Sequence, residues 1–221
     1  MKRKRDTLYP EKKMRRLFKK TTRYWEKVLG DRFSGEDISD IIDRAEKEFL
    51  AIASRLPDIG GKSNPLTFNL IEVAVMLAYY KVLKAESRGV EEIGAVTHDV
   101  VRARLSSYPS FLLRLRGAYL TSACYQKKKR GLAPRSQKRE YPGDWVFTFV
   151  EGDGETFHYG FDYTECGVCK LCESENAREF TPFLCDIDYI TYDAFGMHLF
   201  RTKILGGGDD ICNFRFMRAK K

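Results

Sequence analysis

The sequence contains no apolar run long enough to cross a membrane. Its most apolar stretch, residues 70–80, is too short and contains Glu72, whereas a spanning helix needs about 20 apolar residues. The basic residues 1–5 are followed by neither an apolar core nor a small-residue cleavage site, so we expect no secretory signal and a cytoplasmic location. In a reducing compartment, the six cysteines are expected to serve catalysis or metal binding rather than disulfides.

The sequence also lacks the composition of disordered or fibrous chains and the usual nucleotide and nucleic-acid signatures. With 221 residues, 43% hydrophobic and 32% charged, it has the composition of a soluble globular protein. The glycine run at residues 206–208 fits neither G-x-G-x-x-G nor G-K-[ST], and the adjacent Asp209 and Asp210 would repel phosphate. No helix-turn-helix, zinc-finger or RNA-recognition signature is present, so nucleic-acid binding is not expected.

Charge is distributed unevenly along the chain. Residues 1–30 hold twelve Lys or Arg and three Asp or Glu, which gives +9, although the whole chain carries only +8. A second basic cluster over residues 127–139 contains no acid, and residues 140–210 carry fifteen acids against four bases. The pattern predicts basic helices joined to an acidic C-terminal region.

The N-terminal segment has the period of an amphipathic helix. Apolar side chains recur at helical spacing and basic side chains fill the other face. Pro10 is placed to begin this helix and Gly30 to end it. We interpret the basic face as the solvated side of a helix docked on its own domain, with a partner subunit or an anionic surface as alternatives. The apolar positions are Met14, Leu17, Phe18, Thr21, Tyr24, Trp25, Val28 and Leu29.

Residues 1–126 are predicted to be helical. A second helix opens near Ser34, its candidate cap. A third helix is apolar nearly all round over residues 70–78, so we expect it to be buried, either in the core of the chain or in a dimer interface. Two shorter helices are expected near residues 91–105 and 109–124.

The basic stretch 127–143 contains two glycines and two prolines and is predicted to be a linker or loop.

Residues 144–221 have a different pattern. Alternating apolar residues predict strands at 145–150, 157–163, 197–204 and 211–217, and helices are expected at 165–177 and 181–194. The predicted fold class is α+β: a helical N-terminal half packs, as one compact unit, on a small antiparallel sheet of about four strands with two cysteine-bearing helices.

Five of the six cysteines lie in the last 56 residues. Their spacing, C-x2-C-x2-C-x12-C from Cys166 to Cys185, suggests a metal or iron–sulfur site, with zinc ahead of an iron–sulfur cluster. If a metal is bound, Cys166, Cys185 and Cys212 are its expected ligands. On a helix, however, Cys172 would point away from Cys166 and Cys169, which weakens that reading. Reactive thiols and small buried core residues are the alternatives.

Several other side chains are candidates for chemistry. Cys185 and Asp188 are three residues apart and share a helical face, which suits a thiol beside a base. A carboxylate alone would raise the pKa of that thiol, so its activation must come from elsewhere. Near His198, Arg201 is a candidate carboxylate clamp, with Thr202 beside it.

The C-terminal motifs resemble the L-2-amino-thiazoline-4-carboxylic acid hydrolase family. The resemblance covers roughly residues 140–217, with the helical half agreeing only in general character. Cys169 and Cys172 are additional to the family pattern, and Asn213 stands where an aspartate is expected. The motifs are Tyr163-Thr-Glu-Cys166, Cys185-Asp-Ile-Asp188, Arg201-Thr-Lys-Ile-Leu205 with Gly208, and Cys212-Asn-Phe-Arg-Phe216.

The resemblance implies a hydrolase that opens a 2-aminothiazoline-4-carboxylate ring to N-carbamoyl-L-cysteine. Such a reaction needs a nucleophile or activated water, an acid for the departing sulfur and a cation for the carboxylate. As a hypothesis, Cys185, Asp188 and Cys166 are catalytic, and Arg201, Thr202 and His198 bind a small carboxylate substrate. The alternatives are a cysteine-rich metal or small-molecule sensor and a basic interaction module. A homo-oligomer is a further prediction.

Overall fold

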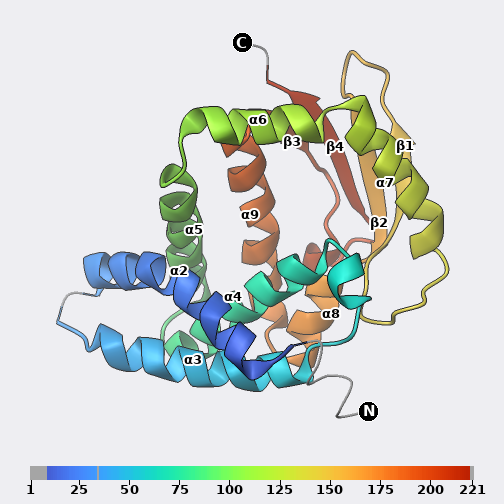
Figure 1. Ribbon diagram of the computed structural model, residues 1–221. Helices are drawn as coiled ribbons and strands as arrows, with labels where there is room; N and C mark the ends of the chain where they lie inside the picture. The colour runs from blue at the N-terminus through green and yellow to red at the C-terminus, as the bar shows by residue number, and fades with distance from the viewer. Residues whose placement is uncertain (1–8, 34, 220–221) are drawn as a thin grey trace.

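The computed structural model describes residues 9–33 and 35–219, in which a helical bundle carries a four-stranded sheet on one side (Figure 1). Helix α4 (Thr67–Ala85) runs through the bundle and is buried on nearly every face, as predicted. Its neighbours in the same chain supply that burial, so α4 needs no second copy to cover it. These neighbours are α2 (Glu11–Arg32), α3 (Ile38–Arg55) and α5 (Val90–Ser106).

Stacked aromatic rings hold the bundle together. The Trp25 ring stacks on Tyr79 at 3.8 Å between centroids, and Phe18 stacks on Phe49 at 5.5 Å. All four side chains are at most 1% exposed. The apolar face of α2 therefore docks on its own domain, which confirms the first reading of this helix.

Helix α3 begins later than expected. The predicted cap, Ser34, lies outside the described residues. Asp37 caps the helix instead, since its Oδ1 accepts hydrogen bonds from the N–H groups of Ser39 at 3.1 Å and Asp40 at 3.2 Å.

The prediction of a loop at residues 127–143 is wrong for its first part, because α7 spans Ala123–Ser136. Lysine and arginine favour helices, and the Ser122 hydroxyl caps this one at 3.3 Å from the Tyr125 N–H. Pro134 is tolerated in the last turn, and contacts with β1 outweigh its intrinsic cost. Helix α6 (Ser110–Leu120) links α5 to α7.

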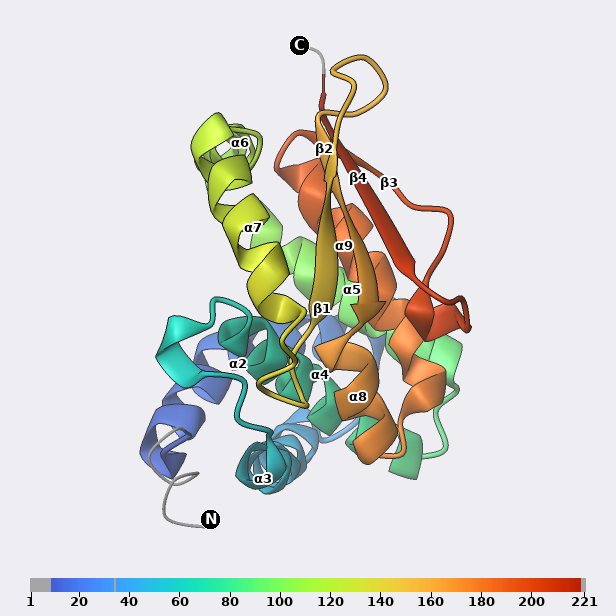
Figure 2. The same cartoon turned by 90° about the vertical axis from the view of Figure 1, so that its right-hand side faces the viewer.

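The four predicted strands form one antiparallel sheet of order β1-β2-β4-β3, which confirms the α+β class. The two cysteine-bearing helices lie between β2 and β3 in the chain, and α9 crosses one face of the sheet (Figure 2). The strands are β1 (Val146–Glu151), β2 (Tyr159–Glu165), β3 (Met197–Phe200) and β4 (Cys212–Arg218); the helices are α8 (Gly167–Ser174) and α9 (Thr181–Ala194). Three short 3₁₀ turns are η1 (Gly61–Ser63), η2 (Arg178–Phe180) and η3 (Leu205–Gly207).

The two faces of the sheet differ in character. The inner face, toward α7 and α9, carries a row of aromatic rings, including Tyr159 stacked on Phe216 at 5.1 Å. The outer face is polar and holds the Asp162–Arg215 ion pair at 2.7 Å. Because side chains alternate along a strand, the pattern decides which residues face the helices. None of the described helices is long and apolar enough to cross a membrane.

Candidate functional site

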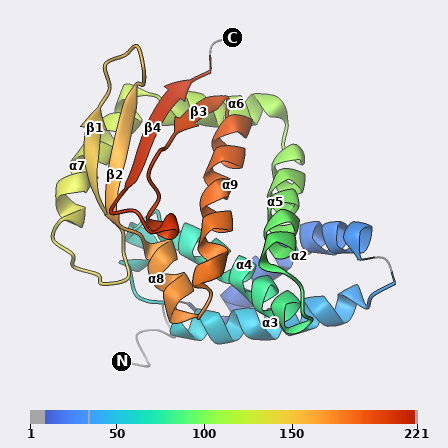
Figure 3. The same ribbon diagram turned by 180° about the vertical axis from the view of Figure 1, so that it is seen from behind.

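Five chain segments meet at one end of the inner sheet face. They are the end of β2, the start of α8, the middle of α9, the segment after β3 and the start of β4 (Figure 3). They bring together the predicted residues Cys166, Cys185, Asp188, Arg201 and Cys212. These groups lie near enough for their charges to shift one another's pKa. The sequence hypothesis therefore selected side chains that do cluster in space.

Cys166 is the N-cap residue of α8, and among the thiols in this cluster it is the one whose pKa is lowered. The neighbouring Cys169 thiol lowers the pKa of Cys166, burial opposes this, and the nearby backbone N–H groups of Cys169 and Val168 add to the lowering. A helix N-terminus stabilises negative charge in this way. Cys169, which is additional to the family pattern, is thus the direct partner of the most activated thiol.

Cys185 has the opposite environment. It lies on α9 and is buried, and burial raises its pKa well above the ordinary value, with the charges of Cys166 and Asp188 acting in the same direction. It is closely covered by η3: a Cβ at Gly206 would lie 3.0 Å from the Cys185 sulfur, so glycine is required for this contact. The thiol environments favour Cys166 over Cys185 as nucleophile.

The other two buried cysteines also have raised pKa values. Burial raises the pKa of Cys212, whose sulfur accepts a hydrogen bond from the Leu205 N–H at 3.1 Å. Burial raises the pKa of Cys172 to about 11. Both fit the role of core cysteines that support the packing of their elements.

Asp188 is set deep in the molecule and is still reached by water. Burial raises its pKa to about 6, while the nearby Arg201 charge partly offsets that effect. Its side chain nevertheless keeps 39% of its surface exposed. The surrounding protein disfavours its charge and the accessible surface leaves room for a ligand. Such a carboxyl group can exchange a proton near neutral pH.

Arg201 is committed to internal contacts. Its side chain is 1% exposed, its Nη1 lies 3.1 Å from Asp188 Oδ2, and its Nη2 donates to the Cys185 carbonyl at 2.9 Å. The guanidinium is held between the rings of Tyr189 and Phe214, each 4.8 Å away. This geometry differs from the open carboxylate clamp expected from the sequence. It makes Arg201 a positioning residue for Asp188.

Thr202 and Asn213 hold the segment after β3. Asn213 Oδ1 accepts from the N–H groups of Thr202 at 2.9 Å and Lys203 at 2.7 Å, and its Nδ2 donates to Thr202 Oγ1. In the structure, Thr202 is engaged with Asn213, and its contact with a substrate stays a prediction. Asn213 stands where the family pattern has aspartate. It belongs to this set of contacts with Thr202 and Lys203, which we call the clasp, and not to the thiol cluster.

His198 does not take part in the cluster. On β3, Met197 and Leu199 are buried while His198 and Phe200 are exposed. His198 therefore points away from the inner face and lies apart from the thiol cluster.

Sequence reasoning missed the tyrosines of the site. Burial raises the pKa values of Tyr163 and Tyr192 far above the ordinary value, and the charge of Asp188 adds to the effect at both hydroxyls. In this site the buried polar atom without a partner among the described residues is Arg201 Nε. The alternation of Phe161 with Tyr163 on β2 was the available signal, because it places both on the inner face.

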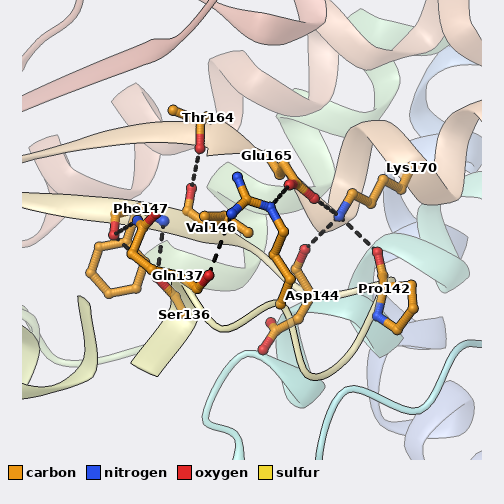
Figure 4. Close-up of polar contacts among 10 residues, drawn as sticks. Ser136, Gln137, Pro142, Asp144, Val146, Phe147, Thr164, Glu165 and Lys170 are labelled. Carbon is orange, nitrogen blue, oxygen red and sulfur yellow. Dashed lines mark hydrogen bonds and ion pairs between the residues drawn. The ribbon is translucent and has the colours of Figure 1, made fainter. Parts of the chain in front are cut away.

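A polar network fixes the junction that carries Cys166. Lys170 Nζ contacts Glu165 Oε2 at 2.5 Å and also donates to the Pro142 carbonyl at 2.7 Å and the Asp144 carbonyl at 3.0 Å. Glu165 also accepts from Arg139 at 2.6 Å (Figure 4). The network ties the start of α8 to the segment between α7 and β1.

The predicted metal site is not formed. Among the residues that the structure describes, no three His, Cys, Asp or Glu side chains are grouped so that they could hold a metal ion. Cys166, Cys185 and Cys212 share a neighbourhood, yet Cys166 is engaged with Cys169 and Cys212 with the Leu205 backbone. Zinc is therefore given no part in the site.

The fold and the cluster define an α+β protein with a buried thiol–carboxylate site. The chain matches the sequence profile of L-2-amino-thiazoline-4-carboxylic acid hydrolase over residues 68–216, about two thirds of its length. It therefore belongs to this family, and the match extends through α4–α7 beyond the C-terminal motifs. No curated protein and no solved structure matches the chain.

Proposed function

We propose that the protein is a hydrolase that opens a 2-aminothiazoline-4-carboxylate ring to an N-carbamoyl-cysteine product, with Cys166 as nucleophile. The observation that carries the proposal is the meeting of two groups at one site: Cys166 at the N-terminus of α8, whose pKa is lowered, and Asp188, which lies 3.1 Å from Arg201 and whose burial raises its pKa to about 6. Such opposite shifts suit groups that take different roles in one reaction. Family membership supplies the substrate class.

In the first step, the Cys166 sulfur attacks the ring carbon bonded to both nitrogen and sulfur. The carbon–sulfur bond of the ring breaks, and the departing sulfur takes up a proton as a free thiol. An isothiourea linkage to Cys166 remains. The Cys169 thiol and the N–H groups at the start of α8 lie beside the attacking thiolate and favour its charged form.

In the second step, water attacks the same carbon and expels Cys166. Asp188 accepts one proton from this water and returns it to the expelled Cys166 thiolate. The second proton passes from the added oxygen to the imine nitrogen, which leaves a urea group on the product. A pKa of about 6 keeps Asp188 mostly ionised at neutral pH and available as base. Arg201 holds the Asp188 carboxylate in place, and Tyr163 and Tyr192 lie near enough for the Asp188 charge to shift their pKa values.

The test is release of free thiol from L-2-amino-thiazoline-4-carboxylate. We expect turnover by the wild type and a loss of at least about 10³-fold in kcat/KM for Cys166→Ser. Cys124→Ser is the matched control, because Cys124 is exposed and belongs to α7 rather than to the cluster. It should retain full activity.

Turnover that survives Cys166→Ser but is lost in Cys185→Ser would return the nucleophile role to Cys185. Absence of turnover by the folded wild type would contradict the proposed reaction. In that case, saturable binding of the thiazoline without thiol release would favour the sensor alternative.

A further inference from the structure

A cavity of about 320 Å³ lies away from the thiol cluster, between α7, β1 and the loop that contains η1. Its walls combine apolar side chains, among them Leu132, Trp145 and Phe147, with basic ones from α7. The volume is at the small end of the range of ligand pockets in proteins. None of the roles assigned above uses this space.

The cavity wall is held in shape by hydrogen bonds between the end of α7 and β1. The Ser136 hydroxyl accepts from the Phe147 N–H at 3.1 Å, and Gln137 Nε2 donates to the Phe147 carbonyl at 2.9 Å. Both contacts are drawn in Figure 4. The space under α7 is therefore preformed rather than a gap between loosely packed elements.

Lys129 is the unusual group of this wall. It is 9% exposed and makes no hydrogen bond or ion pair with any described residue. Its ammonium lies 5.6 Å from the rings of Tyr125 and Phe161 and 5.8 Å from Phe147. Burial lowers its pKa to about 8, and Lys128 adds to this effect. A buried cation without a carboxylate partner is costly unless a ligand supplies the negative charge.

The other charged side chains at the cavity differ in whether they already have a partner in the protein. Arg135 makes no ion pair with a described residue, whereas Arg139 is paired with Glu165 at 2.6 Å. Asp144 is engaged by Asn64 Nδ2 and the Trp145 N–H, and Glu140 is the second acid at the wall. Lys129 and Arg135 thus have no ion-pair partner among the described residues. The negative charges of Asp144 and Glu140 disfavour a doubly charged ligand such as phosphate.

We propose that this cavity binds a small monocarboxylate with an apolar body, whose carboxylate pairs with Lys129 and Arg135 and whose body packs on Trp145 and Phe147. The apolar wall excludes water from the ion pair and so strengthens it. The site is separate from the cluster around Cys166. The Trp145 ring lines the cavity and packs on Gly167, where an added Cβ would lie 2.6 Å from it.

The test is a titration of the intact protein with phenylacetate, read by tryptophan fluorescence. The chain has two tryptophans. Trp25 is 1% exposed and stacked in the helical bundle, so a change reports on Trp145. We expect saturation with a Kd of about 1 mM or lower, and no saturation with the neutral isostere phenylacetamide. The readout is independent of hydrolysis.

Lys129→Met should weaken phenylacetate binding at least about tenfold, and Lys128→Met, the exposed neighbour on the same helix, should leave it unchanged. Arg135→Gln is a second variant, expected to weaken binding several-fold. Thermal unfolding of each variant confirms that it is folded. Equal binding of the acid and the amide, undiminished binding by Lys129→Met and Arg135→Gln, or no saturation with phenylacetate would each overturn the proposal.

Discussion

The helical bundle and the sheet region differ in how completely their buried side chains find partners. In the bundle, Trp25, Tyr79, Phe18 and Phe49 are almost completely buried and stack on one another. Beside the sheet, the aromatic face surrounds groups without a full set of partners, including Asp188 and Lys129. The bundle is built for stability, and the sheet region gives up part of that stability for reactive groups.

The carboxyl groups of Glu175 and Asp188 illustrate this difference between the two regions. Glu175 is 5% exposed, and although burial alone would raise its pKa, hydrogen bonds from Arg55 and Lys81 outweigh that effect and lower it. Asp188 has one arginine partner, and its pKa is raised to about 6. Ionised Glu175 therefore stabilises the fold, whereas burial makes the ionised form of Asp188 less stable.

The largest effect on stability is expected in the bundle. Phe49→Ala removes a fully buried ring that stacks on Phe18 and should lower the free energy of unfolding by about 3–5 kcal/mol. Denaturant unfolding measures the change. Because Phe49 is on α3 and not in the cluster, kcat/KM of the folded fraction should remain unchanged; a parallel loss would mean that the two regions are not separate.

Asp188→Asn should act mainly on activity, lowering kcat/KM by about 10²-fold or more at neutral pH. In the wild type, kcat/KM should rise with pH through about 6 as Asp188 ionises, and the variant should lack this rise. The pH profile of thiol release is the measurement. A variant that keeps the same rise would remove Asp188 from the role of base.

Asp188→Asn also tests how this carboxyl group affects the pH dependence of the stability of the fold. The pKa of Asp188 is about 6 in the folded protein and about 3.9 in the unfolded chain. Protonation of Asp188 therefore stabilises the fold fully below about pH 3.9, and this stabilisation is lost as pH rises through about 6. Asp188→Asn should therefore flatten a decline in stability across this window, as measured by denaturant unfolding.

Glu175→Gln should have the opposite dependence. The lowered pKa of Glu175 gives stability that is present above its unfolded pKa and lost as pH falls through the folded value. We expect a loss of about 1–3 kcal/mol at neutral pH, from weakened hydrogen bonds to Arg55 and Lys81, that shrinks in acid. A loss that is independent of pH would contradict this account.

Cys169→Ala should have a smaller effect. It removes the neighbouring thiol that most lowers the pKa of Cys166, so activity at neutral pH should fall by about tenfold and recover at higher pH. Cys172→Ala is the comparison variant, since its pKa is raised and its thiol is not the partner of Cys166. A loss at neutral pH that persists at high pH would indicate a structural role for Cys169.

Asn213→Asp is expected to have the smallest effect. The carboxylate would still accept the N–H groups of Thr202 and Lys203, and the Thr202 hydroxyl can reverse its hydrogen bond. We expect kcat/KM within about twofold of wild type, since exposed substitutions with conserved contacts are nearly neutral. A large change would place this clasp in contact with substrate.

Much of the fold could be predicted from the sequence because periodicity is local. The helix at residues 181–194 and all four strands follow from it. The loop predicted at residues 127–143 failed because glycine and proline were given more weight than helix-forming lysines and the packing of Ala133 on β1. That packing is a tertiary contact, which local sequence does not show.

The site could be predicted only as a set of residues. Family motifs selected Cys166, Cys185, Asp188, Arg201 and Cys212, and these do meet in space. Their individual roles depend on burial and hydrogen bonds. The start of α8 favours Cys166, burial disfavours Cys185, and Arg201 is enclosed by two aromatic rings and paired with Asp188.

The most direct test of the central claim is the order in which the six cysteines react with iodoacetamide at about pH 6.5, well below the usual cysteine pKa of about 8.5. Peptide mapping after limited labelling of the native protein gives this order. We predict that Cys166 is labelled first, ahead of the exposed Cys124 and the buried Cys185. Labelling of Cys124 or Cys185 before Cys166 would contradict the assignment of Cys166 as the reactive thiol.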